Sequence, residues 1–149
     1  MKIVHVLLTH DFAGSERYAV ELANAQAARH EVTMILHRRA AETRPDAIAH
    51  RLVPAVRTLF VGGWAPLATW SAAKLLERLP VEVAHAHLSA ACRALHGLRG
   101  RFLRVATLHI RYKRQQHAGL DALIAITPWQ LDEIPAEQRA SASQIDNWT

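Results

Sequence analysis

The sequence predicts an α/β domain in which a doubly wound, mostly parallel sheet carries helices on both faces. Short apolar runs that suit strands alternate along the whole chain with stretches whose apolar residues recur at helical spacing. The first run, at residues 3–8, leads through a loop with one glycine into a helical stretch. The chain has 149 residues, of which 50% are hydrophobic, so we expect one domain over residues 1–149 with a substantial core.

The first half of the chain is expected to begin with two buried strands, at residues 3–8 and 31–36. Between them, residues 16–29 carry mostly alanines on one stripe, which predicts a helix with Ser15 available as its N-cap. Residues 51–54 are expected to form a short edge strand, since an edge tolerates the proline at its end. Loops are expected at residues 38–46 and 59–66.

Further apolar runs in the second half predict strands at residues 81–88, 103–109, 122–126 and 143–148. Helices are expected from about residue 66 to residue 79 and from residue 89 to residue 98, the latter with Ser89 as N-cap. Thr127 is expected to cap another helix with Pro128 at its first position, where proline is favoured.

Several classes of protein are excluded or disfavoured by composition. One cysteine, Cys92, cannot form an internal disulfide framework and suits a reducing compartment. No run approaches the ~18 apolar residues of a membrane span. Met1 and Lys2 lead directly into strand-like residues without a signal-peptide pattern. We therefore expect a cytoplasmic location.

Positive charge is concentrated in the middle of the chain. The formal net charge is +5, and no Asp or Glu occurs from Val83 to Leu120. Such clustering indicates either an anionic partner (phosphate, acidic lipid or nucleic acid) or simply a solvated face. Nucleic acid is not expected, because no aromatic residues are interleaved with the charges. The basic residues of this segment are Arg93, Arg99, Arg101, Arg104, Arg111, Lys113 and Arg114.

Candidate site residues follow from the rule that ligands bind beyond the carboxyl ends of parallel strands. His85 and His87 share a strand face, which raises the question of zinc. No cysteine pair or carboxylate completes a ligand set, so no metal is expected. The residues near the strand ends are His10, Asp11 and Gly14 after the first strand, His87 and Ser89 after the fourth, and His109 and Arg111 after the fifth.

The loop at residues 9–17 offers the clearest binding chemistry. A buried strand, a tight loop and a helix place free backbone N–H groups at a helix N-terminus, which suits a phosphate or another anion. The sequence has no G-x-S-x-G elbow, no Walker A loop and no G-x-G-x-x-G pattern. A single glycine at such a turn is a weak signal by itself.

Six segments in register resemble family-4 glycosyltransferases. Residues 13–23 look like the G-G-x-E loop and first helix of that family, with Ala13 in place of the first glycine, and residues 30–35 resemble its G-H-E-V-T-V strand. The other four matches are Val83–His87 with D-V-V-H-A-H, Ala106–His109 with T-x-H, Ala122–Trp129 with I-A-V-S-x-W, and Ile145–Trp148 with I-x-N-G/W-V.

The resemblance implies a GT-B architecture, of which this chain is the amino-terminal, acceptor-side Rossmann-like domain. The family's E-x7-E pair, which holds the donor sugar in the carboxyl-terminal domain, has no match here. The resemblance therefore implies that the donor-binding domain is absent and that the isolated chain does not transfer sugar.

The resemblance also assigns roles to individual residues. Gly14 and Ser15 are expected at the donor diphosphate, and His109 is expected as the catalytic residue beside the reacting sugar. Asp11, His87 and Arg111 are expected to contact acceptor or phosphate. Members of the family are retaining and need no metal, with a nucleotide-sugar as co-substrate and no cofactor. If the Ala13 position required a positive φ, alanine there would cost about 1 kcal/mol.

Related enzymes act on lipid-linked or lipopolysaccharide acceptors, which suggests a role for the basic segment in binding an anionic membrane or acceptor. Basic residues beside an anionic membrane contribute about 1 kcal/mol each, so Arg111, Lys113 and Arg114 together would give ~3 kcal/mol. This predicts salt-sensitive, peripheral binding at the inner face of the cytoplasmic membrane. The alternative is a non-catalytic Rossmann-type module that binds an anionic glycan or lipid head group.

Overall fold

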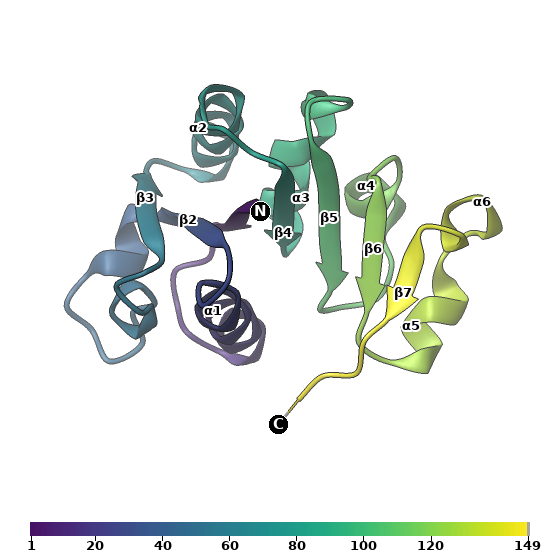
Figure 1. Cartoon of the computed structure of the whole chain (residues 1–149), viewed down its shortest axis with the longest axis horizontal. Helices are drawn as coiled ribbons and strands as arrows, with labels where there is room; N and C mark the ends of the chain where they lie inside the picture. The colour runs from purple at the N-terminus through teal and green to yellow at the C-terminus, as the bar shows by residue number, and fades with distance from the viewer. Residues whose placement is uncertain (149) are drawn as a thin grey trace.

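The computed structural model describes residues 1–148 and contains one seven-stranded sheet (Figure 1). All neighbouring strands are parallel, in the order β3-β2-β1-β4-β5-β6-β7. The predicted doubly wound parallel sheet is confirmed. The strands are β1 Lys2–Leu7, β2 Glu31–His37, β3 Arg57–Val61, β4 Val83–His87, β5 Leu103–Leu108, β6 Ala122–Ala125 and β7 Ala142–Gln144.

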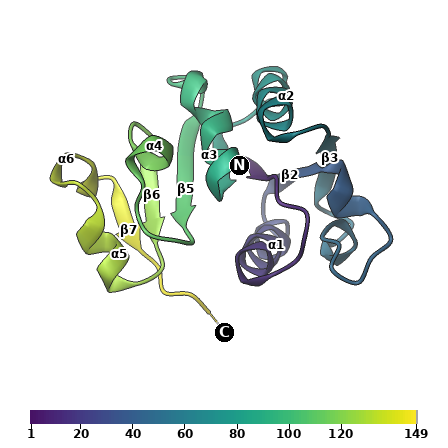
Figure 2. The ribbon, with the colours of Figure 1, turned by 180° about the vertical axis from the view of Figure 1, so that it is seen from behind.

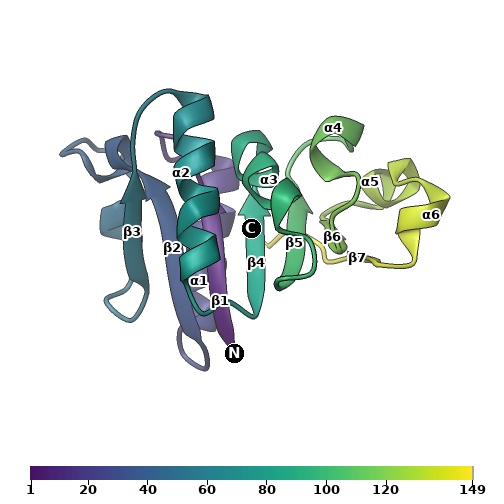
Figure 3. The ribbon, with the colours of Figure 1, turned by 90° about the horizontal axis from the view of Figure 1, so that it is seen from above.

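Helices cover both faces of the sheet, as predicted. α2, α3 and α4 lie together on one face (Figure 3), and α1 lies on the opposite face. No helix among residues 1–148 is long and apolar enough to cross a membrane. The α-helices are α1 Gly14–Gln26, α2 Ala65–Arg78, α3 Ser89–Leu95, α4 Arg114–His117, α5 Pro128–Glu133 and α6 Ala136–Arg139; the 3-10 turns are η1 Arg38–Ala41, η2 Ala49–Arg51 and η3 His96–Leu98.

The core is divided between the two faces by the two-residue period of the strands. In β1, Ile3 and Leu7 pack with α1 residues such as Ala19. Val4 and Val6 point to the other face and pack under α2 and α3. Because both faces are buried, the strands read as nearly continuous apolar runs rather than alternating ones.

Strand order reverses between β1 and β4. The chain moves outward from β1 to β2 and β3, and then returns to place β4 on the other side of β1. At such a switch point the connections on either side diverge to opposite faces and leave a crevice at the carboxyl ends of the strands. The loop after β1 and the ends of β4 and β5 therefore lie at the part of the sheet best suited to bind a ligand.

The edge strand is not where the sequence placed it. Arg51 ends η2 and residues 52–54 form no strand, and β3 instead covers Arg57–Val61, part of which was expected to be loop. β3 pairs with β2 over five residues, from Thr33 with Arg57 to His37 with Val61. The prediction was wrong because the glycines at 62 and 63 suggested a loop for the apolar residues before them.

Two predicted caps were also wrong. The N-cap of α1 is Ala13 rather than Ser15, so α1 begins two residues earlier than expected. The N-cap of α3 is Leu88 rather than Ser89. In α5 the N-cap is Thr127 and Pro128 is the first helical residue, as predicted.

Candidate functional site at the carboxyl edge of the sheet

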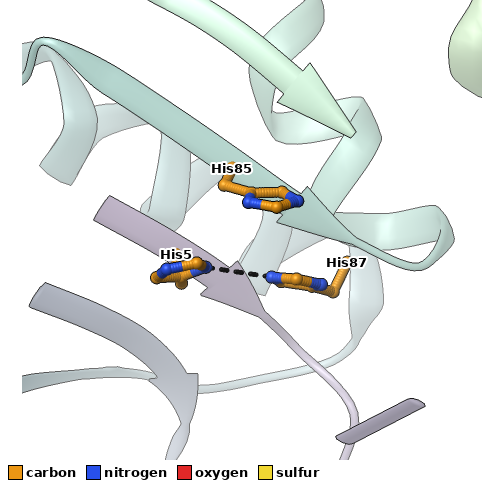
Figure 4. A group of neighbouring side chains, drawn as sticks. All are labelled: His5, His85 and His87. Carbon is orange, nitrogen blue, oxygen red and sulfur yellow. Dashed lines mark hydrogen bonds between the residues drawn. The ribbon is translucent and has the colours of Figure 1, made fainter. Parts of the chain in front are cut away.

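Three histidines, in or directly after three neighbouring strands, form a hydrogen-bonded line. His5 of β1 bonds through Nδ1 to Nε2 of His87 at the end of β4, at 3.0 Å (Figure 4). Nδ1 of His87 in turn bonds to Nε2 of His109, just after β5, also at 3.0 Å. At the inner end, Nε2 of His5 lies 2.7 Å from Oε1 of Gln26 in α1. We call these four residues, Gln26, His5, His87 and His109, the histidine line.

Register explains why these rings meet. Leu7 lies opposite His87 across β1 and β4, and His5 lies opposite His85. With the two-residue period, His5, His85 and His87 all project to the α1 face of the sheet. His109 continues the same face beyond β5. The sequence analysis selected His87 and His109 but missed His5 and Gln26. His5 could have been found from its position two residues before the end of the first strand, which gives it the same face as that strand end.

Burial keeps the histidines of this cluster neutral. Desolvation lowers the pKa of His5 to about 4 and that of His109 to about 4. The pKa values of His85 and His87 are also lowered well below the usual value, by burial first and then by repulsion from the neighbouring imidazoles. None of these shifts includes a contribution from a nearby carboxylate. At neutral pH the site therefore offers imidazole dipoles rather than positive charge.

His5, His85 and His87 are also the one group of three among residues 1–148 close enough to suggest a metal, with ligand atoms within 4.8 Å of one another. The lone pair of an imidazole lies in the plane of its ring, so ligands must aim their ring planes at the metal. His85 and His87 are instead stacked, with centroids 4.4 Å apart and 24° between planes. Both ring nitrogens of His5 and of His87 are already hydrogen-bonded. This geometry gives a metal no support, and the metal-free expectation stays a prediction.

The N-terminus of α1 is the second part of the site. Glu16 accepts hydrogen bonds from the N–H of Ala13 at 3.2 Å and from the hydroxyl of Thr9 at 2.7 Å. Within residues 1–148 the N–H groups of Gly14 and Ser15 make no hydrogen bond, and a Cβ added to Gly14 would meet open space. Ala13 has φ −139°, which any residue adopts, so alanine carries no backbone strain there.

Tyr18 joins the two parts of the site. It lies about one turn after Gly14 on α1, and its ring meets His109 edge-on at 5.0 Å between centroids. The segment after β7 runs back toward α1 (Figure 2), where Trp148 stacks on Tyr18 at 4.5 Å. The indole N–H of Trp148 also bonds to Glu21. Sequence analysis missed Tyr18, because nothing in the sequence indicates which aromatic residue faces the strand ends.

Two of the three predicted contact residues, Asp11 and Arg111, form ion pairs and do not belong to the histidine line. Asp11 is exposed and paired with Arg44, whose hydrogen bond lowers the pKa of Asp11. Arg111 is paired with Glu133 at 2.8 Å. His87 belongs to the histidine line and has no exposed surface. The roles assigned to these residues stay predictions, and an anion would have to compete with Glu133 for Arg111.

The basic segment does not form one surface. Arg104 is buried and donates to Asp121 and to three main-chain carbonyls, so it belongs to the core of the fold. Arg114 lines a cavity of about 320 Å³ with Arg99, Asp121 and Glu137, where both signs of charge occur. Lys113 is exposed. The charge cluster seen in the sequence is thus dispersed by the fold.

Leu88, directly after His87, has φ 70° and ψ 177°. This conformation is essentially restricted to glycine and costs a larger residue about 1–3 kcal/mol. We expect Leu88→Gly to be more stable than Leu88→Ala by about 1 kcal/mol or more, because both lose the side chain and only glycine loses the strain. Urea unfolding of the two variants measures the difference.

The control for this prediction is Leu67, an exposed leucine within α2. Glycine in a helix interior is less favourable than alanine by about 1 kcal/mol. The order of the Gly and Ala variants should therefore be opposite at Leu67. The same order at both positions would show that Leu88 is not strained.

Comparison with known proteins places this chain in a family. The family model described as Glycosyltransferase Family 4 matches residues 12–145, and no curated protein matches the chain in sequence. A crystal structure of Anabaena HepE with UDP and glucose has a TM-score of 0.70 at 16% identity and covers 99% of this chain and 44% of its own. A glycosyltransferase from Rickettsia africae gives 0.68 at 14%, with 97% and 42% covered.

At these identities the solved structures show the fold alone, and this chain spans less than half of their length. The shared fold is the Rossmann-like α/β domain of GT-B glycosyltransferases. The family match extends from the loop before α1 to the residue after β7, and so includes Gly14, His87 and His109. The chain belongs to glycosyltransferase family 4.

Proposed function

We propose that this chain is the acceptor-side half of a retaining glycosyltransferase, which moves a sugar from a nucleotide-sugar to a cell-envelope glycan or lipid-linked acceptor. The observation that carries the proposal is the position of His109. It stands at the half-buried end of the histidine line, against Tyr18, and Tyr18 lies about one helical turn after the open N-terminus of α1. This arrangement supports an anion site and a neutral imidazole that serve one ligand near the switch point of the sheet.

In this proposal the N–H groups of Gly14 and Ser15 bind the donor diphosphate. A helix N-terminus contributes only ~0.3–1 kcal/mol, and up to ~2 when partly buried, so it orients the diphosphate more than it holds it. Most of the donor affinity must come from a second domain. Structures of Anabaena HepE with UDP and glucose, and with UDP-glucose, are consistent with a nucleotide-sugar donor.

His109 would act on the sugar itself. Transfer of a glycosyl group passes through a transition state with oxocarbenium character, which a nearby cation would repel. Because burial lowers the pKa of His109 to about 4, its imidazole is neutral at physiological pH and can hydrogen-bond a sugar hydroxyl without that repulsion. The leaving phosphate would then help to deprotonate the acceptor, so His109 need not be a base.

All three residues of the proposed membrane patch are exposed, but within residues 1–148 only Lys113 and Arg114 make no ion pair, whereas Arg111 is partly neutralised by Glu133. At about 1 kcal/mol each, two free cations support only weak, salt-sensitive contact with an acidic surface. We therefore propose peripheral association at the inner face of the cytoplasmic membrane, secondary to binding of the acceptor.

Nucleotide release from UDP-glucose tests the proposal. The chain alone should turn over negligibly, and activity should appear when a donor-binding domain is supplied. In that assembled enzyme, His109→Ala should reduce turnover by about 10²-fold, which is typical for loss of one hydrogen bond made in the transition state.

The control is His50→Ala, which changes an exposed histidine on η2, outside the site. It should leave turnover unchanged. Robust transfer by the isolated chain would contradict the proposal that a second domain must bind the donor. Full turnover in His109→Ala would contradict the role of His109. No turnover in the assembled protein, with ligand affinity retained in His109→Ala, would instead favour the non-catalytic binding module.

A further inference from the structure

The histidine line is continuous from the partly buried Gln26 of α1, through the buried His5 and His87, to His109 after β5. Gln26, His5, His87 and His109 are joined by contacts of 2.7, 3.0 and 3.0 Å. Both ring nitrogens of His5 and of His87 are used in these contacts. His109 uses only Nε2, and its Nδ1 makes no hydrogen bond within residues 1–148.

Proton counting restricts how such a line can be built. A neutral imidazole has one N–H donor and one acceptor nitrogen. Desolvation lowers the pKa of each of these three histidines well below neutrality, so each carries one proton. Each contact between two rings then needs one donor and one acceptor. The line therefore has only two arrangements, with every N–H pointing inward toward α1 or every N–H pointing outward.

The group at the inner end decides between them. The atom of Gln26 that faces His5 is the carbonyl Oε1, which can only accept. Nε2 of His5 must then carry the proton, which leaves its Nδ1 as acceptor for Nε2–H of His87. By the same step, Nδ1 of His87 accepts from Nε2–H of His109.

We propose that Gln26 and His5 are positioning residues, which through His87 hold His109 as the Nε2–H tautomer and leave Nδ1 of His109 as a hydrogen-bond acceptor. The line then selects the chemical class of its ligand. An acceptor nitrogen bonds a hydroxyl and disfavours the unprotonated oxygens of a phosphate or carboxylate. His109 thus meets a sugar hydroxyl, and the diphosphate is left to the N–H groups of α1. Only this last assignment rests on the proposed function.

Nitrogen NMR of the histidine side chains tests the proposal on the chain itself, with no sugar or partner domain. Long-range 15N–1H correlation distinguishes a protonated from an unprotonated ring nitrogen. At pH 7.5 we expect the Nε2–H form for His5, His87 and His109. The exposed His50 should show the averaged shifts of mixed tautomers. Nδ1–H signals on His87 and His109 would overturn the proposal, because they require the outward arrangement.

Variants at Gln26 test whether the end group sets the direction. Gln26→Glu keeps an acceptor-only group and should preserve the Nε2–H tautomer of His109. Gln26→Leu removes the acceptor and should shift the His109 nitrogens toward averaged values. Unchanged shifts in Gln26→Leu would overturn the role of Gln26.

Gln115→Leu, at an exposed glutamine of α4, is the matched control and should change nothing at His109. Should Gln26→Leu not fold, Gln26→Asn withdraws the carbonyl by one methylene and gives the same reading. The tautomers are measured without turnover, so a failure here is distinguishable from a failure of the proposed activity.

Discussion

Acidification from pH 7.5 to pH 4.5 is expected to destabilise this domain by several kcal/mol. The buried histidines are neutral in the folded protein, and they gain protons readily when it unfolds. For His5, the pKa is lowered from 6.5 to about 4 by burial. By 1.36 kcal/mol per pKa unit, His5 alone loses about 3 kcal/mol as the pH falls through that interval.

The sign follows from proton binding. Between pH 6.5 and about 4 the unfolded chain binds protons that the folded chain does not, so the free energy of unfolding falls as pH falls. His85, His87 and His109 act in the same direction. Burial would raise the pKa of Asp121, but hydrogen bonds from Arg104 outweigh it and lower that pKa. Asp121 therefore loses its contribution only at lower pH.

Urea unfolding at a series of pH values between 7.5 and 4.5 measures the slope. His5→Gln keeps a side chain that can bond to both neighbours but removes one titrating group, so its slope should be smaller than that of the native protein. His50→Gln removes an exposed histidine and should leave the slope unchanged. A free energy of unfolding independent of pH in this range would show that the cluster is not neutral in the fold.

Substitution of Arg104 is expected to have the largest effect of any single change considered. Its guanidinium pairs with Asp121 at 3.1 Å and donates to the carbonyls of Leu95, His96 and Gly119. Removing one partner of a buried ion pair costs about 3–5 kcal/mol, because the other charge is left without compensation. We expect Arg104→Met to fall at the lower end, since the Asp121 side chain is 31% exposed.

Thermal or urea unfolding of Arg104→Met measures this loss, with Arg101→Met as the matched control at an exposed arginine of the same segment. Arg104→Lys should recover only part of the stability, because an ammonium cannot reproduce the fork that reaches four acceptors. The double variant Arg104→Met/Asp121→Asn should lose less than the sum of its parts. If Arg104→Met were as stable as Arg101→Met, the ion pair would be of no consequence to folding.

The burial of Arg104 could not be predicted from the sequence. In the sequence it is one of several basic residues in a segment without acidic ones, and it was counted with a surface charge cluster. Its partner, Asp121, is 17 residues away and lies in the stretch where the sign of charge reverses. Charge patterning along a chain does not distinguish a solvated arginine from a buried one, because burial depends on which elements pack together.

The fold itself was accessible because it depends on local signals. Apolar runs such as 3–8 and 31–36 and the helical spacing between them are present in the sequence, and their alternation is compatible with few arrangements other than a doubly wound parallel sheet. The exceptions were also local. The strand at Arg57–Val61 and the caps at Ala13 and Leu88 were mistaken because flanking glycines and serines are weak guides to where an element starts.

The candidate site, like the fold, was predicted only in part. The sequence alone determined the strand-loop-helix around Gly14, and placed His87 and His109 near strand ends. Only the tertiary structure decided that β1 lies beside β4 and β4 beside β5, in a register that brings His5 within 3.0 Å of His87 and His87 within 3.0 Å of His109. The physical reason is that the two-residue period of a strand determines which face a side chain takes, whereas strand order and register determine which side chains it meets there.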